Sequence, residues 1–358
     1  MIHKFSYSVS LLLISVVTMV INTSVYANPS GSILDNEEAT NQKNYKVGIT
    51  LTALRDIDDA HSTFYADFYI SISWYEEGCA KLAAGDAERS ILKTEEAWET
   101  VQNPHIEFIN AYGSEDSHIQ DADLIVHNNG ICTYSFRYSG LFRSHMDLRH
   151  FPFDHQKLKI IIESSELGIS MLRLVPGRFN DIENLKLMIP DLPDWEIDGV
   201  SFDEGIGEYP YLEDSETSYS RLTLTVDVTR QYNHYIWKFL LPLVIIVILS
   251  WTVFWIGPEQ LESQMQVSIS CVFSVIAFNF ITAGQLPRIG YLTVLDLWVL
   301  LSYIFVSAGT IENTISHYLI STGRKDFAEK VDQWSRILFP VAYFILIIII
   351  LIRSLMLN

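Results

Sequence analysis

The chain has 358 residues, of which 49% are hydrophobic, and its mean hydropathy is +0.19. It carries 43 acidic against 24 basic residues, and 36 of the acidic residues lie within residues 28–234. Because a region this acidic repels phosphate backbones and attracts cations, nucleic acid is not expected as a partner.

The N-terminus has the features of a secretory signal peptide. His3 and Lys4 give a short positive start, and the apolar run from Val9 to Ile21 is too short to span a bilayer comfortably. Small residues before Asn28 provide a plausible cleavage site. We expect residues 1–27 to be a signal peptide, with an uncleaved anchor as the alternative, and the following domain to be exported.

Residues 28–234 are expected to form one extracellular immunoglobulin-like β-sandwich. In the run from Phe64 to Trp74, apolar and aromatic side chains alternate, which is typical of a half-buried strand. Further β-prone runs lie at residues 45–54, 124–127, 131–143, 156–163, 171–175, 195–202 and 219–228. Many short strands separated by turns favour a sandwich. Residues 88–101 are a moderately helical interruption.

The sequence gives no sign of a metal site or an enzyme. It contains no CxxC or comparable metal-binding spacing, no glycine-rich phosphate loop and no nucleophile motif. We therefore expect no metal, no cofactor and no catalytic residue. Cys79 and Cys132 could pair in an exported domain, but nothing in their spacing requires it.

Residues 235–358 are expected to be the transmembrane domain. Four helices are predicted, over about residues 236–256, 261–283, 292–318 and 334–356, and their lengths suit a lipid bilayer. The loop between the second and third helices carries only Arg288, whereas the region between the third and fourth is basic. Its basic residues are Arg324, Lys325, Lys330 and Arg336. The positive-inside rule therefore predicts that this second region is cytoplasmic and the N-terminal domain outside.

The second predicted helix is too polar to face lipid on every side. Polar side chains at this depth must face protein or water. At about 100° per residue, its side chains form one stripe, acidic at the cytoplasmic end and aromatic towards the outside. The stripe consists of Glu262, Gln266, Ile269, Phe273, Ala277 and Phe280, with Ser270 at its edge. Several copies around an axis would stack these residues into the rings of a pore. The alternative is a polar helix buried within a single bundle.

The run Phe151-Pro152-Phe153-Asp154-His155-Gln156 resembles the signature loop of the pentameric ligand-gated ion channels, the nicotinic receptor superfamily. The resemblance extends over nearly all of residues 44–358. It is carried further by Arg230-Gln231-Tyr232 before the first helix, Pro242 and Ser250–Trp255 within it, Ile276–Asn279 in the second, and Leu286-Pro287-Arg288 after the second. Ile276–Asn279 is similar to bacterial members.

This chain departs from the animal members of that family. Ser144 and Leu158 stand where animal members have the two cysteines that bracket the loop, and the connection between the third and fourth helices is very short. Both features are similar to prokaryotic members, which implies the inner membrane of a bacterial cell. Ser62 stands where one bacterial homologue has its proton-sensing acidic residue.

The resemblance implies a homopentamer that conducts monovalent cations. Five copies of Glu262 would form a carboxylate ring that concentrates cations, and anion-selective relatives lack this carboxylate. Phe273 and Phe280 would form apolar rings that stop ions by dewetting. At the junction of the two domains, a charge cluster near Pro287 would couple them. Its members are Asp59, Asp154 and Arg230.

The activating signal is left open between a small amine and protons. In the family, agonists bind between subunits behind a hairpin, here about residues 205–218. The corresponding candidates are Glu163, Tyr209, Tyr211 and Tyr219, and aromatic rings with a carboxylate suit a cationic amine. Histidines expected at the junction are candidates for pH sensing, namely His61, His150, His155 and His234. The alternative function is a membrane-anchored sensor or binding protein without conduction.

Overall fold

The structure, a computed structural model, describes residues 42–83, 89–93, 97–113, 118–189, 192–210, 218–257, 259–283 and 289–356. The predicted signal peptide over residues 1–27 and the site candidates Tyr211 and Pro287 lie outside the described residues.

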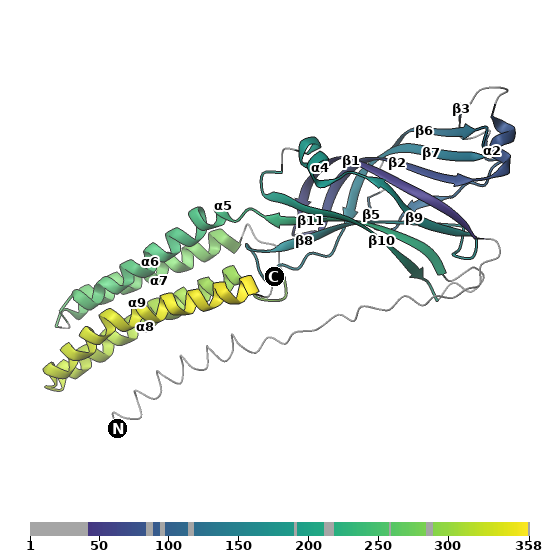
Figure 1. Ribbon diagram of the computed structural model, residues 1–358. Coiled ribbons are helices and arrows are strands. Elements are labelled where there is room, and N and C mark those ends of the chain that lie inside the picture. The colour runs from purple at the N-terminus through teal and green to yellow at the C-terminus, as the bar shows by residue number, and fades with distance from the viewer. Residues whose placement is uncertain are drawn as a thin grey trace. The chain divides into compact units, whose positions relative to one another are not determined.

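Two β-sheets form the N-terminal part of the described chain (Figure 1). The strands are β1 (Lys43–Asp58), β2 (Thr63–Tyr75), β3 (Arg89–Lys93), β4 (Ile106–Phe108), β5 (Ala111–Tyr112), β6 (His118–His127), β7 (Ile131–Arg143), β8 (His155–Ser164), β9 (Leu172–Phe179), β10 (Trp195–Glu208) and β11 (Ser218–Arg230). One sheet has the order β3-β6-β7-β2-β1-β9, with β5 paired to β7, and the other has the order β10-β11-β8-β4. The predicted β-sandwich is confirmed.

The core of the sandwich is built from the alternation that the sequence displays. On β2, Phe68, Ile70, Ile72 and Trp74 are buried, and they belong to the same apolar cluster as the inward-facing residues of the opposite sheet. Those residues are Leu158, Ile160 and Ile162 of β8 and Leu222, Leu224 and Val226 of β11. Burial of each large apolar side chain contributes about 1.5–3 kcal/mol.

The expectation of a helix over residues 88–101 is wrong for residues 89–93, whereas Ala97 is helical and its carbonyl accepts from the Val101 N–H at 3.1 Å. Residues 89–93 form strand β3, which pairs antiparallel with β6 from Arg89 opposite His127 to Lys93 opposite Asp123. Pairing with a neighbouring strand has overridden a weak local helical preference. Short helices occur elsewhere in this domain, namely α2 (Glu77–Leu82) and α4 (Ile182–Met188). Cys79 of α2 forms a disulfide with Cys132 of β7, which settles the pairing that the sequence left open.

The C-terminal part is a bundle of helices long and apolar enough to cross a membrane four times. The first helical segment runs through α5 (Asn233–Tyr235), the π-helix η1 (Ile236–Leu240), α6 (Leu241–Trp251) and the 3-10 helix η2 (Thr252–Trp255). It is followed by α7 (Leu261–Ala283), α8 (Val294–Ser321) and α9 (Lys325–Met356). Each contributes to one apolar core, in which Val247, Val275, Val306 and Tyr343 are fully buried. The predicted four-helix transmembrane architecture is confirmed.

Candidate functional site

One face of α7 is exposed along its whole length. All seven residues predicted to line a pore lie on this face, namely Glu262, Gln266, Ile269, Ser270, Phe273, Ala277 and Phe280. The two aromatic side chains are among the most exposed large apolar groups of the protein, at 64% for Phe273 and 76% for Phe280. The same face exposes the polar side chains of Glu262, Gln266 and Ser270, and polar groups on a membrane helix must face protein or water and not lipid.

The opposite face of α7 packs inside the bundle and carries two polar side chains. Gln264 Nε2 donates to the Ile256 carbonyl at 2.9 Å, and Asn313 Nδ2 of α8 donates to Ser268 Oγ at 2.9 Å. Gln266 and Ser270 are exposed instead. The polar residues of α7 therefore lie on two faces, one packed in the bundle and one exposed. This arrangement differs from the alternative prediction, in which all polar groups of the helix are buried within a single bundle.

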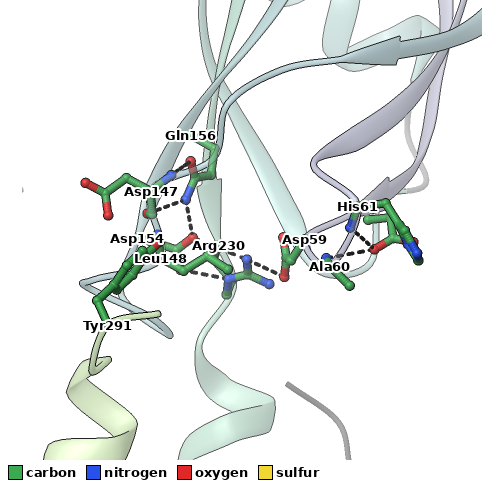
Figure 2. Close-up of polar contacts among 10 residues, drawn as sticks. Asp59, Ala60, His61, Asp147, Leu148, Asp154, Gln156, Arg230 and Tyr291 are labelled. Carbon is green, nitrogen blue, oxygen red and sulfur yellow. Dashed lines mark hydrogen bonds and ion pairs between the residues drawn. The ribbon is translucent and has the colours of Figure 1, made fainter. Parts of the chain in front are cut away.

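A buried charge cluster lies at the end of the sandwich nearest the helices (Figure 2). The antiparallel register of β8 and β11 pairs His155 with Thr229, which brings Asp154 beside Arg230. Arg230 Nε donates to Asp154 Oδ1 at 2.8 Å, and its Nη2 donates to Asp59 Oδ2 at 2.8 Å and to Asp154 Oδ2 at 3.2 Å. Three of the predicted coupling residues thus lie together.

Aromatic rings complete the surroundings of this guanidinium. It lies 4.1 Å from the ring centre of Trp195 and 4.8 Å from that of Phe151. Such cation–π contacts strengthen when the site is desolvated, and only 3% of the Arg230 side chain is exposed. The cluster is therefore an arginine held on two sides by carboxylates and stacked on aromatic rings.

The two carboxylates of the cluster have different environments. Burial raises the pKa of Asp59, and Arg230 lowers it by less, so the pKa of this carboxyl lies above its usual range. One of its oxygens, Oδ1, is buried without a donor in the described part of the chain. Asp154, in contrast, also accepts a hydrogen bond from Gln156 Nε2 at 2.6 Å. Asp59 is the less well satisfied partner of Arg230.

The loop between β7 and β8 connects this cluster to the membrane helices. Gln156 holds the loop, because its amide donates to the Asp147 carbonyl and accepts from the Asp147 backbone N–H. The Leu148 N–H donates to the Tyr291 hydroxyl at 3.0 Å (Figure 2). Further on, the Val294 N–H of α8 donates to the carbonyl of Arg149 at 3.1 Å. The loop is thus hydrogen-bonded to the start of α8.

Sequence reasoning missed three residues at this junction, Gln156, Trp195 and Tyr291. Gln156 belongs to the signature motif, and its place in the motif is the signal that could have identified it as a junction residue. Trp195 and Tyr291 lie in separate segments, and nothing in the linear sequence connects them with Arg230 or Leu148. The Phe151-Pro152 peptide bond in the loop is cis.

The four candidate histidines have four separate sets of partners. His61 lies 2.8 Å from Asp58 Oδ2, and His150 lies 3.3 Å from Ser354 Oγ of α9. His155 contacts Thr229 Oγ1, and the His234 ring packs on Tyr235 and Phe239. Burial lowers the pKa of His150. Among the described residues, no group of three or more His, Cys, Asp or Glu side chains could hold a metal ion.

The hairpin region brings together three of the four ligand-site candidates. Tyr209 donates from its hydroxyl to Glu163 Oε2 at 2.9 Å, and its ring lies 5.8 Å from that of Tyr219. Sequence reasoning missed Arg221, which pairs with Glu163 Oε1 through its Nε. A Cβ atom at Gly207 would collide with the same carboxylate, so a larger residue there would displace the Glu163 side chain. Glu163 is therefore a neutralised carboxylate with 2% of its side chain exposed.

Known proteins similar to this chain point to one family. A family model described as the neurotransmitter-gated ion-channel ligand binding domain matches residues 32–232, and another described as the neurotransmitter-gated ion-channel transmembrane region matches residues 239–326.

Individual relatives differ in how much of the chain they share. A proton-gated ion channel of Gloeobacter violaceus is 29% identical over 311 residues, which are 85% of this chain and 81% of that protein. A gamma-aminobutyric acid receptor subunit beta of Lymnaea stagnalis is 28% identical over 199 residues, 54% of this chain and 38% of its own length. The pH-sensitive chloride channel 2 of Drosophila melanogaster is 26% identical over 215 residues, 58% of this chain and 40% of its own. Because the first family model covers more than half of the chain, the protein belongs to the neurotransmitter-gated ion channels, a family of pentameric ligand-gated channels and not of enzymes.

Proposed function

We propose that five identical copies of this chain form a cation-selective channel in the inner membrane of a bacterium, with the sandwich outside the cell and α7 lining the pore. The observation that carries this proposal is the exposed face of α7, which a single chain leaves uncovered and a ring of copies would turn towards an aqueous axis. A signal peptide over residues 1–27 is part of the same proposal.

Cation selectivity rests on Glu262. The carboxylate is exposed in the first turn of α7 and leads the stripe, so five copies would form an acidic ring at the cytoplasmic mouth. Relatives of this chain include chloride channels, so membership of the family leaves the sign of the permeant ion to residues such as this one. The strongly acidic outer domain supports a cation, because it raises the local cation concentration.

The test is the reversal potential of purified protein in bilayers under a potassium chloride gradient. We expect the wild-type reversal potential to approach the equilibrium potential of potassium. Glu262→Gln should move the reversal potential towards zero. Glu259→Gln is the matched control, because Glu259 is also exposed but pairs with Lys325 Nζ at 2.6 Å. A reversal potential close to the equilibrium potential of chloride would overturn cation selectivity. Purified protein that gives no current would favour the alternative function, a sensor or binding protein without conduction.

For the activating signal, we favour protons over a simple amine. Arg221 already neutralises Glu163, so a monoamine would have to displace the Arg221 guanidinium, whose side chain is 30% exposed, before it could pair with this buried carboxylate. The alignment with the proton-gated relative covers 81% of that relative's length, and this similarity also supports protons as the activating signal. The residues of the hairpin site are then structural, whereas the junction carboxylate Asp59 becomes a candidate for the titrating group.

A two-axis activation experiment separates the two signals. Currents are recorded while pH is scanned without any amine, and then while small amines are scanned at a fixed pH. We expect activation along the pH axis, and a shift of its midpoint in Asp59→Asn. Activation by amines alone, abolished by Glu163→Gln, would overturn the preference for protons.

A further inference from the structure

Two carboxyl groups lie inside the helix bundle, apart from the pore face and the junction. Glu312 of α8 is 8% exposed and Asp332 of α9 is 2% exposed. Neither forms an ion pair with any Lys, Arg or His of the described residues. Two buried anions without a cation are costly in a membrane domain, so these groups need another explanation.

The hydroxyl groups around the carboxyls cannot satisfy both as anions. Ser316 Oγ lies 2.7 Å from Asp332 Oδ1 and 3.3 Å from Glu312 Oε1, but it has one proton to donate. Ser335 Oγ donates to the same Glu312 Oε1 at 3.3 Å. The second oxygen, Glu312 Oε2, is buried and has no donor among the described residues.

The two carboxyl groups are also close neighbours, because the single Ser316 hydroxyl reaches an oxygen of each. Carboxylates only accept, so a hydrogen bond between two carboxyl groups requires a proton on one of them. Like charges at this separation repel strongly in a low-dielectric site, and such pairs share a proton instead. A proton on one of the two carboxyl groups therefore accounts both for the missing donor and for the closeness of two acidic side chains.

Other charged groups on the neighbouring elements point elsewhere. Glu262 of α7 is exposed, about 160° around that helix from the buried Gln264 that faces the bundle interior. On α8, His317 is offset by roughly 140° from Glu312. On α9, Arg336 Nε donates to the Phe254 carbonyl of η2 at 3.0 Å. The segment η2 itself, Thr252–Trp255, has no titratable side chain.

We propose that Glu312 and Asp332 form a proton-binding site that holds one shared proton per subunit at neutral pH and joins α8 to α9. Asn313, the next residue on α8, is fully buried and donates to Ser268 on the bundle side of α7. Loss of the proton therefore places a second negative charge one residue away from the contact between α8 and α7. This site goes beyond the proposed function, because it depends neither on ion selectivity nor on the activating signal.

Infrared spectroscopy of the full-length protein in D₂O detects the proton directly. At neutral pH the wild type should show the C=O stretching band of a protonated carboxyl group. The band should be lost in Glu312→Gln and in Asp332→Asn, because the introduced amide donates to the remaining carboxylate and leaves it ionised. Asp326→Asn, which removes an exposed carboxylate from the same helix, should retain the band.

A wild-type spectrum without the band at neutral pH would overturn the proposal, and this arm needs no variant to fold. A band that persists unchanged in both amide variants would also overturn it. Neither readout involves current, so a protein that proves not to conduct cations leaves this test intact.

Thermal unfolding as a function of pH gives an independent measure. The folded protein holds a proton that the unfolded chain releases at neutral pH, so the pair's contribution to stability falls as pH rises. Tm of the wild type should therefore fall more steeply towards alkaline pH than Tm of Glu312→Gln or Asp332→Asn, whereas Asp326→Asn should follow the wild type. Parallel curves for the wild type and both amide variants would contradict a shared proton.

Discussion

Arg230 and Asp154 form a buried ion pair, with 3% of one side chain and 1% of the other exposed and 2.8 Å between Nε and Oδ1. Arg230 is the last residue of β11, and Asp154 belongs to the loop that is hydrogen-bonded to α8. The pair therefore joins the strand that leads into the first membrane helix to the loop that contacts the third.

Removing one partner of this pair should destabilise the protein strongly. Asp154→Asn leaves a buried guanidinium with weakened pairing, and the loss of a partner in such pairs costs about 3–5 kcal/mol. Thermal unfolding in detergent should show a clear fall in Tm. The control is Arg173→Ala, since Arg173 and Glu204 form an exposed pair of the kind that contributes only about 0–1 kcal/mol. Equal effects of the two variants would contradict a special role for the buried pair.

Neighbouring carboxylates at the β1–β2 turn should respond to pH with opposite signs. Burial raises the pKa of Asp59, whereas hydrogen bonds from His61 and from the Ala60 N–H outweigh burial and hold the pKa of Asp58 below its usual range. The contribution of Asp59 to stability is thus present at acidic pH and lost as pH rises through its folded pKa. The contribution of Asp58 is present at higher pH and lost as pH falls through its folded pKa.

Two single variants can separate these contributions. Tm is measured between about pH 3 and pH 7, the range in which carboxyl groups titrate. Relative to the wild type, Asp59→Asn should lose stability towards acid, and Asp58→Asn should lose it towards neutral pH. Deviations of the same sign in both variants would refute the assignment.

Truncation of the exposed aromatic ring on α7 should make the channel easier to open. A narrow apolar ring resists ions because it dewets, so Phe273→Ala should shift the activation midpoint towards weaker stimuli or give current without stimulus. Phe278→Ala is the matched control, because Phe278 is half-buried and packs on Phe239 at 6.5 Å within the bundle. Unchanged activation in Phe273→Ala would exclude this residue as the gate.

The disulfide of the sandwich should contribute to the stability of the extracellular domain. Cys79 and Cys132 are 53 residues apart, and loops of this size make a disulfide worth about 2–4 kcal/mol. Cys79→Ser should lower Tm, and reductant should lower the wild-type Tm in the same way but leave Cys79→Ser unaffected. Cys271→Ser, which changes the buried free cysteine, should keep the response to reductant.

Much of the membrane domain was predictable from local sequence. A spanning segment in lipid must satisfy its backbone hydrogen bonds internally, so an apolar run of sufficient length folds as a helix. The helical period alone then separates Gln266 and Phe273 from Gln264 and Val275, and the structure has the first two exposed and the second two buried. Local reasoning failed at residues 89–93, because strand formation in β3 depends on its partner β6.

The sequence by itself determined the order of the two domains, the alternation of the strands and the stripe on α7, because these follow from periods of two and about 3.6 residues within one segment. Only the tertiary structure decided which charges meet. Arg221 neutralises Glu163 from 58 residues away, and Ser316 lies between Glu312 and Asp332 of two different helices. Such pairs are set by strand register and by helix packing, and no local pattern records either.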